Sequence, residues 1–472
     1  MLILIKMVAQ NSFFGFEGII TVQKLLFQPK ALLTYLVAIA VFFSAAMPSH
    51  GQQVSIIRDA EIESMVRNFA APLLRAAGIQ RAPRIVIVND RRFNAFVTED
   101  GNIYVNYGTI LESPNPAALK AVLAHEIGHL AGGHIARLRE QMEVRAQAQA
   151  ISMLLGIGAM AAASGSGAAP EVSQAAAAFI MASQSASLNS LAAYRQSEES
   201  AADAAALRIL QQAGQSPRGL VETLRILLEN QVQRSGAAAY LQTHPLAQDR
   251  LQQVEQTARQ SPYWNQGDSS ADIRALEMAK AKITGFLESS STVANVYPNS
   301  NSSLPARYAR AIAAYRGGGG VSALQVMPNL IAEAPSNPYM RELYGQMLYE
   351  LGRPVEAIAP LRRAVELAPD ETQIRILYGQ ALIGAGGSAN LNEAVLQLRR
   401  SAVSEPRNVR IHTLLSQAFA GLGMMGHASL SAAEAAAARN DMPTARGLAR
   451  QATQQLPQGG PEWLRANDIL SN

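Results

Sequence analysis

Two histidines and a glutamate stand at the spacing that a catalytic metal site requires. His125, Glu126 and His129 form the pattern His-Glu-x-x-His inside residues 119–137. On a helix, positions i and i+4 share one face, so both histidines can reach one metal ion. Glu126 then lies beside that metal, where a carboxylate can take a proton from a bound water. The pattern predicts a metal-dependent hydrolase, provided that a third ligand is found.

The segment around the motif has the signals of a helix. Asn115 can cap it, Pro116 fits its first turn, and residues 117–123 are good helix formers. The neighbours of the motif are small or apolar, which predicts a buried face. Burying two histidines and a glutamate costs free energy unless these side chains have partners or a function. We therefore favour a metal site over histidines that only form hydrogen bonds in the core.

A third histidine nearby has the wrong spacing. His134 follows His129 by five positions, whereas the pattern HExxHxxGxxH needs six, and Ile135 stands at that position. Gly132 matches the pattern, but the ligand does not. His134 is therefore expected to be rotated off the metal face, and either to support the site indirectly or to be structural.

A downstream helix offers an acidic ligand instead. Residues 194–212 are predicted to be helical and to end at Gly214, a glycine typical of a helix C-terminus. Glu199 and Asp203 are four apart and share a face, so Glu199 could bind zinc while Asp203 accepts a hydrogen bond from a ligand histidine. The alternative is an acidic first turn favoured by the helix dipole, which accounts for Glu198 more easily than for Asp203.

Elements that precede the motif predict a small sheet. Apolar residues recur at helical spacing over 55–78 and stop at Gly78, while 84–88, 93–97 and 103–105 are typical of short strands. We therefore predict an α+β domain that is mostly helical and has a small antiparallel sheet. The edge of that sheet could hold an extended substrate by backbone pairing, or the strands could only complete the core.

Separated motifs, in this order, resemble those of the HtpX, CAAX-prenyl and Oma-type zinc peptidases. They are HEIGH at 125–129, the ExxxD pattern at 199–203 and a His-Pro…Arg element at 244–250. The triplet Asn94, Ala95 and Phe96, followed by residues 102–107, resembles the substrate-binding edge strand of this family.

The resemblance implies a gluzincin-type metalloprotease that binds one Zn²⁺ per chain. Its ligands would be His125, His129 and Glu199, and Asp203 would lie behind them. Zinc lowers the pKa of a bound water to about 7, so that Glu126 can act as the general base and hydroxide can attack the scissile carbonyl. Glu126 would later give the proton to the leaving amine.

The resemblance also places His244 near the metal. There it would either steady the oxyanion through an imidazole N–H or occupy the open coordination position as a latch, which a neutral imidazole can do. Arg250 would stabilise the reacting carbonyl oxygen or anchor the loop of His244. The alternative is a simple His-Pro turn.

Between the two predicted zinc-binding helices lies a tract rich in Ala, Ser, Gly and Met, residues 146–191. Its apolar stretches, 150–163 and 175–182, are both too short to span a bilayer, and residues 164–170 have the composition of a turn. A mobile lid over the cleft, a hairpin that contacts a membrane protein and a plain pair of Ala-rich helices remain open.

Helical repeats are predicted for the C-terminal part, residues 303–472, after a linker at 261–302 that carries one helix. Counting from residue 338, small and proline positions match the 34-residue tetratricopeptide pattern. The matching residues are Gly345, Ala357, Leu361, Ala364 and Pro369. Tyr344 departs from it, and the next unit has a three-residue insertion in its turn. About four units would stack into an all-α solenoid that binds peptides or partner proteins.

The composition of the chain excludes several classes of function. The net charge of +4 is too small to indicate nucleic acid, and the absence of cysteine excludes thiolate-bound zinc, disulfides and a thiol nucleophile. Residues 1–51 are predicted to be a leader, because Lys30 precedes an apolar run at 31–46 that ends in small residues. An uncleaved anchor is the alternative, but the run is shorter than the roughly 20 residues of a spanning helix. The protease domain is expected at 52–260.

A cleavable signal peptide, a zinc peptidase and tetratricopeptide repeats together resemble the BepA (YfgC) family of the Gram-negative periplasm. The resemblance implies an endopeptidase that degrades misfolded or stalled outer-membrane proteins and assists their assembly. Its partners would be unfolded or misassembled outer-membrane proteins and, through the repeats, the β-barrel assembly machinery, with no nucleic acid and at most peripheral membrane contact. A second hypothesis is a latched, largely non-proteolytic chaperone or adaptor that scaffolds β-barrel assembly through its repeats.

Overall fold

A computed structural model describes residues 55–165, 170–233, 244 and 248–471. The predicted leader and its cleavage site lie outside the described residues. The same is true of residues 166–169, within the predicted turn of the Ala-rich tract, and of the residues that flank His244. Among the helices that the structure describes, none combines the length and the apolar character needed to cross a membrane.

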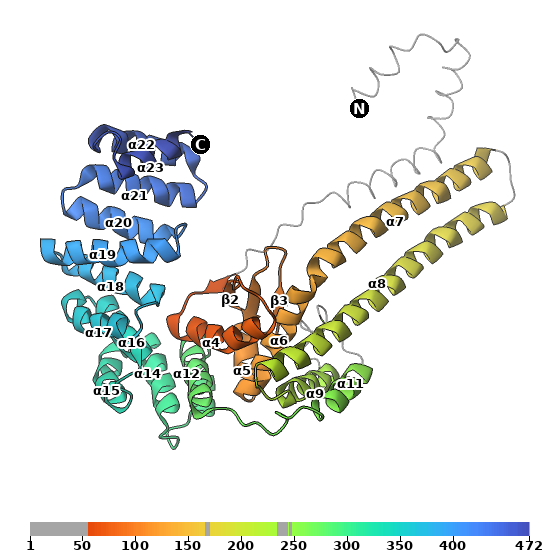
Figure 1. The fold of residues 1–472 in the computed structure, drawn as a ribbon, viewed down its shortest axis with the longest axis horizontal. Helices are drawn as coiled ribbons and strands as arrows, with labels where there is room; N and C mark the ends of the chain where they lie inside the picture. Colours follow the sequence, from red (N-terminus) through yellow and green to blue (C-terminus); the bar gives the residue numbers. More distant parts are fainter. Residues whose placement is uncertain (1–54, 166–169, 234–243, 245–247, 472) are drawn as a thin grey trace, which may run out of the picture. The chain divides into compact units, whose positions relative to one another are not determined.

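A four-stranded sheet lies next to the motif helix (Figure 1). Its strands are β1 (Ile56–Ile57), β2 (Ile85–Val88), β3 (Ala95–Val97) and β4 (Ile103–Asn106), in the order β1-β2-β4-β3. The hairpin of β3 and β4 is antiparallel, as predicted, and β1 is antiparallel to β2. However, β2 and β4 are parallel, so the prediction of a wholly antiparallel sheet is wrong. After β2 the chain forms β3 at the edge of the sheet. It then forms β4, which lies between β2 and β3 and runs parallel to β2.

The first helix begins later than its apolar pattern predicts. Residues 56–57 form β1, and α4 spans Ala60–Ala76. Asp59 caps α4 by accepting a hydrogen bond from the backbone N–H of Ile62 at 3.0 Å. At the other end Gly78 takes a φ of +72°, the left-handed conformation that the sequence predicted for a terminating glycine.

The motif helix, α6 (Pro116–Gly132), runs through the core of the first part of the chain. Asn115 caps it through a 2.8 Å hydrogen bond from the N–H of Ala118, and Pro116 occupies the first turn, as predicted. It follows the short helix α5 (Tyr107–Glu112), and it packs against α4, β3 and the helices α8 and α9 described below. Because it is enclosed by other elements, α6 is buried along almost its whole length, so its motif residues lie in the interior.

Two long helices, α7 (His134–Gly165) and α8 (Pro170–Gln212), run side by side in Figure 1. The Ala-rich tract is thus a helical pair. The predicted helix at 194–212 is only the last part of α8, which places Glu198 and Glu199 far from its first turn. The alternative of an acidic first turn favoured by the helix dipole is therefore wrong for these residues.

The α7–α8 pair has an unusual distribution of side chains. Where the two helices face each other, small side chains such as Ser152, Gly156 and Ser183 are at least partly buried. The large apolar side chains are exposed instead. They include Ile151, Leu154, Leu155, Phe179, Met181 and Leu188.

The remaining helices of this part are α9 (Arg218–Gln233) and α11 (Gln248–Ala258), followed by α12 (Ser270–Leu287) and α13 (Ser290–Val296). The linker at 261–302 was predicted to carry one helix, but it contains both α12 and α13. The longer of the two, α12, packs against α4 and α5 and also against α14, the first repeat helix. Since α12 packs against helices of the first domain and of the repeats, the predicted domain limits at 260 and 302 stay proposals.

Ten helices from α14 to α23 form five consecutive pairs in the described residues, one more than the roughly four units predicted. They are α14 (Leu304–Arg316), α15 (Gly320–Glu333), α16 (Pro338–Glu350), α17 (Pro354–Leu367), α18 (Thr372–Ala385), α19 (Ser388–Ser404), α20 (Val409–Gly421), α21 (Met425–Ala438), α22 (Met442–Gln455) and α23 (Pro461–Ser471). A Cβ on Gly345 would lie only 2.4 Å from Cγ of Leu361, which explains why the pattern needs a small residue there. This is the all-α tetratricopeptide solenoid that the sequence predicted.

A buried group of charges joins the repeats to α4. Nζ of Lys282, on α12, lies 2.8 Å from Asp59, 3.5 Å from Glu61 and 3.7 Å from Glu342 of α16. The hydroxyl of Tyr308 donates a hydrogen bond to Glu61 at 3.1 Å. Three carboxylates thus surround one buried ammonium group.

Two ion pairs flank this buried group at the surface. Nη2 of Arg67 lies 2.6 Å from Glu371, and Nη2 of Arg58 lies 2.6 Å from Glu405. Both arginine side chains are substantially exposed, so each pair contributes little to stability. The buried group around Lys282 is therefore the polar contact with the greater influence on packing.

Candidate metal centre

Four buried side chains converge on one point. They are His125 and His129 of α6, Glu199 of α8 and His244, and each offers one ligand atom within 4.8 Å of all the others. Nε2 of His129 lies 3.1 Å from Nε2 of His125, and Glu199 lies 3.3 Å from each of these nitrogens. Nδ1 of His244 lies 3.4 Å from Nε2 of His125 and 3.0 Å from Glu199. The structure therefore brings the three ligands implied by the resemblance together, with a fourth donor.

These separations fit a tetrahedral metal ion. Zinc holds nitrogen and oxygen ligands at about 2.0–2.2 Å, and a tetrahedron of that size has edges of about 3.3–3.6 Å. Five separations between donor atoms, counting both oxygens of Glu199, are 3.0–3.4 Å and close to these edges, and the four donors all lie within 4.8 Å of one another. Two imidazoles and a carboxylate are also the donor set of many catalytic zinc sites. The residues present fit zinc.

The charges of the site fit a dication as well. Glu126, Glu199 and Asp203 are buried with a single guanidinium, that of Arg250. In their ionised forms these groups leave two negative charges in excess, which a divalent cation would balance. Neither carboxylate oxygen of Glu126 accepts a hydrogen bond, although Oε1 lies 3.5 Å from Nε2 of His244, and burial raises the pKa of this residue. An unsatisfied carboxylate in the interior indicates a group whose partner is a cation or a water.

Asp203 lies behind the first ligand histidine. Its Oδ1 is 3.0 Å from Nδ1 of His125, so it fixes the tautomer in which Nε2 faces the other donors. Burial disfavours the charged form of His125, but hydrogen bonds with Asp203 and Glu199 outweigh it and raise the pKa of His125 to about 10. In contrast, burial lowers the pKa of His129 to about 4.

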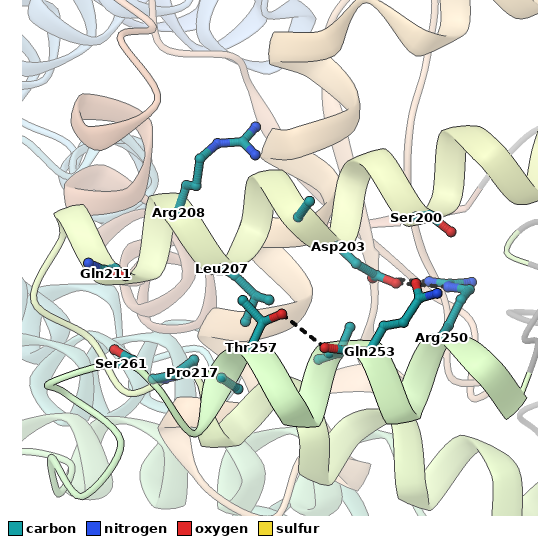
Figure 2. A pocket seen from close by; sticks show the side chains of 13 residues that line it. Ser200, Asp203, Leu207, Arg208, Gln211, Pro217, Arg250, Gln253, Thr257 and Ser261 are labelled. Carbon is teal, nitrogen blue, oxygen red and sulfur yellow. Dashed lines mark hydrogen bonds and ion pairs between the residues drawn. The ribbon is translucent and has the colours of Figure 1, made fainter.

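Arg250 contacts carboxylates. Its Nε and Nη2 donate hydrogen bonds to Asp203 at 2.8 and 3.0 Å, and Nη1 lies 3.1 Å from Glu199. Figure 2 shows the pair with Asp203 beside a cavity of about 280 Å³ between α8 and α11. These contacts connect Arg250 to carboxylates of α8, and both roles expected for Arg250, stabilising the carbonyl oxygen and anchoring the loop of His244, stay predictions.

A second chain of contacts lies behind the other ligand histidine. Nδ1 of His134 is 2.9 Å from Nδ1 of His129, and Nε2 of His134 is 3.2 Å from Oε2 of Glu198. Arg137 lies 2.8 Å from the same oxygen of Glu198. His134 is therefore close to the site, although its spacing keeps it off the face of the metal ligands.

His244 also contacts the edge of the sheet. Its Nε2 lies 3.2 Å from the carbonyl oxygen of Ala95 on β3, which is an edge strand. The carbonyl of Asn94 accepts a hydrogen bond from Asn106 of β4, and polar groups of successive strand residues point to opposite sides. The N–H and C=O of Ala95 therefore point away from β4, but Ala95 is fully buried, so a further strand could pair there only after the side chains that cover it, His244 among them, have moved. One imidazole thus reaches both the metal donors and this edge.

The other two predicted substrate-binding residues support β3. The N–H of Asn94 donates a 2.8 Å hydrogen bond to the hydroxyl of Thr109, which donates back to the carbonyl of Asn94 at 2.7 Å. Phe96 stacks on Tyr104 of β4, with ring centroids 5.2 Å apart. These contacts fix the strand, and the role of all three residues toward substrate stays a prediction.

Sequence reasoning missed the pairing of His134 with Glu198. Its signal was present, because Glu198 and Glu199 are consecutive and cannot both face the same side of one helix. A glutamate beside a ligand, together with a histidine just off the metal face, indicates a second polar contact behind the site. The spacing alone does not show which of the two motif histidines is contacted by His134.

Comparisons with known proteins agree with this geometry. The sequence model described as "Peptidase family M48" matches residues 57–258. The beta-barrel assembly-enhancing protease of Escherichia coli (strain K12) is 25% identical over 297 residues, which cover 61% of this chain and 58% of that protein. Protease HtpX of Chromohalobacter salexigens is 32% identical over 106 residues, or 21% of this chain and 35% of that protein.

Comparison with solved structures gives matches of low similarity. One of them is titled "MamA MSR-1 C2", is 18% identical, has a TM-score of 0.31 and covers 35% of this chain and 94% of that one. The curated relatives are only partly matched, because the chain spans 58% and 35% of their lengths. Residues 57–258 match the sequence model of peptidase family M48, and the chain resembles the beta-barrel assembly-enhancing proteases.

Proposed function

We propose that this protein is a zinc-dependent endopeptidase. The observation that carries the proposal is the convergence of His125, His129 and Glu199, with the unsatisfied carboxylate of Glu126 beside them. The M48 match over the same residues supports a metallopeptidase. Zinc bound by these three residues would supply a Lewis acid that polarises a carbonyl oxygen and makes water acidic near neutral pH.

Residues of the chain would perform the remaining steps. Glu126 would accept a proton from the attacking water and later deliver it to the nitrogen of the leaving amine. Asp203 and Arg250 would keep His125 and Glu199 in place. The outward-facing groups of Ala95 would pair with the backbone of an extended substrate, so that its scissile bond passes the ligand atoms.

His244 is proposed to be a latch. A catalytic zinc site keeps one position open, but His244 supplies the fourth donor of the tetrahedron. The same ring contacts the carbonyl of Ala95, on which a substrate N–H would bind. Because the ring uses both places, cleavage requires that His244 move away, and an incoming strand would compete with it.

The substrates proposed are misfolded or stalled outer-membrane proteins in the periplasm. The similarity to beta-barrel assembly-enhancing proteases supports this class, and the signal-peptide pattern at 31–46 supports export. An unfolded β-strand is suited to pair with the edge strand β3 once Ala95 is uncovered, since its polar backbone groups need partners. The repeats would bring the substrate or the β-barrel assembly machinery to the peptidase domain.

The variant Glu126→Gln tests the mechanism. We expect it to lower kcat on an unfolded outer-membrane protein by about 100- to 10,000-fold, because it removes the general base but keeps the shape of the side chain. Glu140→Gln, a change at an exposed acid of α7, is the matched control and should leave kcat unaltered. Full activity of Glu126→Gln would show that the mechanism is wrong.

The second candidate function is a chaperone or adaptor that scaffolds β-barrel assembly. The contact of His244 with both the donors and Ala95 favours it, because a site closed in this way would cleave rarely. Expression of Glu126→Gln in a deletion strain separates the two candidates. Restored outer-membrane assembly without cleavage would show that scaffolding is independent, and failure to restore it would show that proteolysis is needed.

A further inference from the structure

The contacts behind His129 allow only one arrangement of protons if its Nε2 binds a metal. Nε2 faces the other donors, 3.3 Å from Glu199, so it must be unprotonated to bind. The proton of His129 is then on Nδ1, which donates to Nδ1 of His134 at 2.9 Å. His134 in turn carries its proton on Nε2 and donates it to Glu198 at 3.2 Å. In both hydrogen bonds the donor is thus the ring nearer to the metal position, and the last acceptor is the carboxylate of Glu198.

The turn between α6 and α7 is shaped for this contact. A Cβ on Gly132 would lie 2.2 Å from Nε2 of His134, so any larger residue would displace the ring. The next residue, Gly133, has a φ of +65°, which reverses the chain at low cost. His134 then begins α7 and turns back beneath His129, with the two rings perpendicular and their centroids 4.8 Å apart.

Glu198 is held by Arg137 as well as by His134, and the helix dipole does not account for it. It lies far from the N-terminus of the 43-residue helix α8, so the helix dipole does not favour an acid there. Its side chain is only 16% exposed, and Arg137 holds it at 2.8 Å. Arg137 belongs to the first turn of α7, close to His134 in the sequence. One helix therefore supplies consecutive acids, Glu199 among the donors and Glu198 behind them.

We infer that Glu198 and His134 are positioning residues that hold His129 in the tautomer and orientation needed to bind the metal. They would do for His129 what Asp203 does directly for His125. Each ligand histidine would thus be oriented by a carboxylate, in one case through a second imidazole. The inference rests on the metal-dependent function proposed above, but its consequence is metal affinity rather than turnover.

Zinc affinity of the purified full-length protein, measured by competition with a chromophoric chelator, tests the inference. His134→Phe keeps a ring of similar shape without nitrogens, and we expect it to weaken zinc binding about 10- to 100-fold. His134→Asn keeps an acceptor near Nδ1 and should recover part of that loss. Glu140→Gln serves as the control, and affinity equal to that of the unmodified protein in His134→Phe would overturn the inference.

A second variant guards against a folding defect. Glu198→Gln changes a less buried residue, and it should weaken zinc binding in the same direction while the melting temperature of the metal-free protein stays constant. Because both residues act along one chain of hydrogen bonds, Glu198→Gln should add little to the effect of His134→Phe in the double variant. Full additivity of the two losses would contradict a shared role.

The visible absorption of the cobalt-substituted protein gives a readout that a purely structural role would not change. We expect His134→Phe and Glu198→Gln to alter the ligand-field band, since the orientation of one imidazole changes. If the unmodified protein binds zinc tightly but does not cleave protein, the proposed function fails and this inference stands. If the protein is a peptidase and the variants keep its zinc affinity and cobalt spectrum, only this inference fails.

Discussion

Nε2 of His244 lies 3.2 Å from the carbonyl oxygen of Ala95, while Nδ1 of the same ring lies 3.0 Å from Glu199. One side chain therefore connects the edge strand to the metal donors. In the proposed latch, a substrate strand that pairs with Ala95 would displace this imidazole, and the same displacement would open a coordination position. Substrate binding and opening of the site would then occur together.

The latch predicts that His244→Ala raises basal proteolysis. If the ring is in place about 90% of the time, its removal should increase the initial rate on an unfolded protein about 10-fold. His412→Ala, which changes a histidine of the repeats, provides the control and should not raise the rate. A clean loss of activity in His244→Ala would instead support stabilisation of the oxyanion.

The ligand assignment predicts that Glu199→Ala binds zinc weakly. Loss of a ligand should reduce the affinity by more than the roughly 10- to 100-fold that loss of an outer partner costs. Metal content after dialysis, measured by atomic absorption, checks this result against Glu140→Ala. Zinc retention equal to that of the unmodified protein would disprove the role of Glu199.

The buried charges around Lys282 predict a pH-dependent stability. Burial raises the pKa of Glu342 to about 8, with Asp59 and Glu61 adding to the shift and Lys282 opposing it. An acid whose pKa is higher in the folded state than in the unfolded one stabilises the fold at low pH. That stabilisation is complete below an ordinary pKa of 4.5 and is lost as the pH rises toward 8.

Glu342→Gln should therefore flatten the pH dependence of stability. Between about pH 5 and about pH 8 the unmodified protein should lose about 1–3 kcal/mol that the variant does not lose. Melting temperatures across this range provide the measurement, with Glu277→Gln, at an exposed acid of α12, as the control. Parallel curves for Glu342→Gln and the unmodified protein would contradict the prediction.

Close packing of the repeats predicts that Gly345→Val is destabilising. The new Cβ would meet Leu361 at 2.4 Å, and overpacking of this kind costs about 1–3 kcal/mol. Gly447→Ala on α22 is the matched control, because a Cβ there meets nothing within 4 Å. Denaturant unfolding should show a lower midpoint only for Gly345→Val, and equal midpoints would show that the helices can move apart.

Local chemistry made much of the site predictable. The spacing of His125 and His129, the cap at Asn115 and the glycine at 214 each depend on residues that are close in the sequence. The pair Glu199 and Asp203 was also visible, since both lie on one face of one helix. The structure brings the two histidines and the two acids together, as these signals predicted.

Contacts between distant segments were not predictable in the same way. The parallel pairing of β2 with β4 arises because β4 lies between β2 and β3. No residue in either strand specifies that position. Likewise, nothing local shows that Glu198 lies beneath His134 or that Lys282 is surrounded by acids from α4 and α16. The early start of α8 was missed because its Ala- and Ser-rich first part lacks a helical stripe of apolar residues.

The continuity of α8 has a mechanical consequence. At a rise of 1.5 Å per residue, its 43 residues form a rod about 65 Å long. Its exposed Phe179 and Met181 stand many turns away from Glu198 and Glu199, yet all four belong to the same rod. Because the helix is continuous from Pro170 to Gln212, a tilt of its outer end would displace both acids, and α8 would couple that end to His125 and His129.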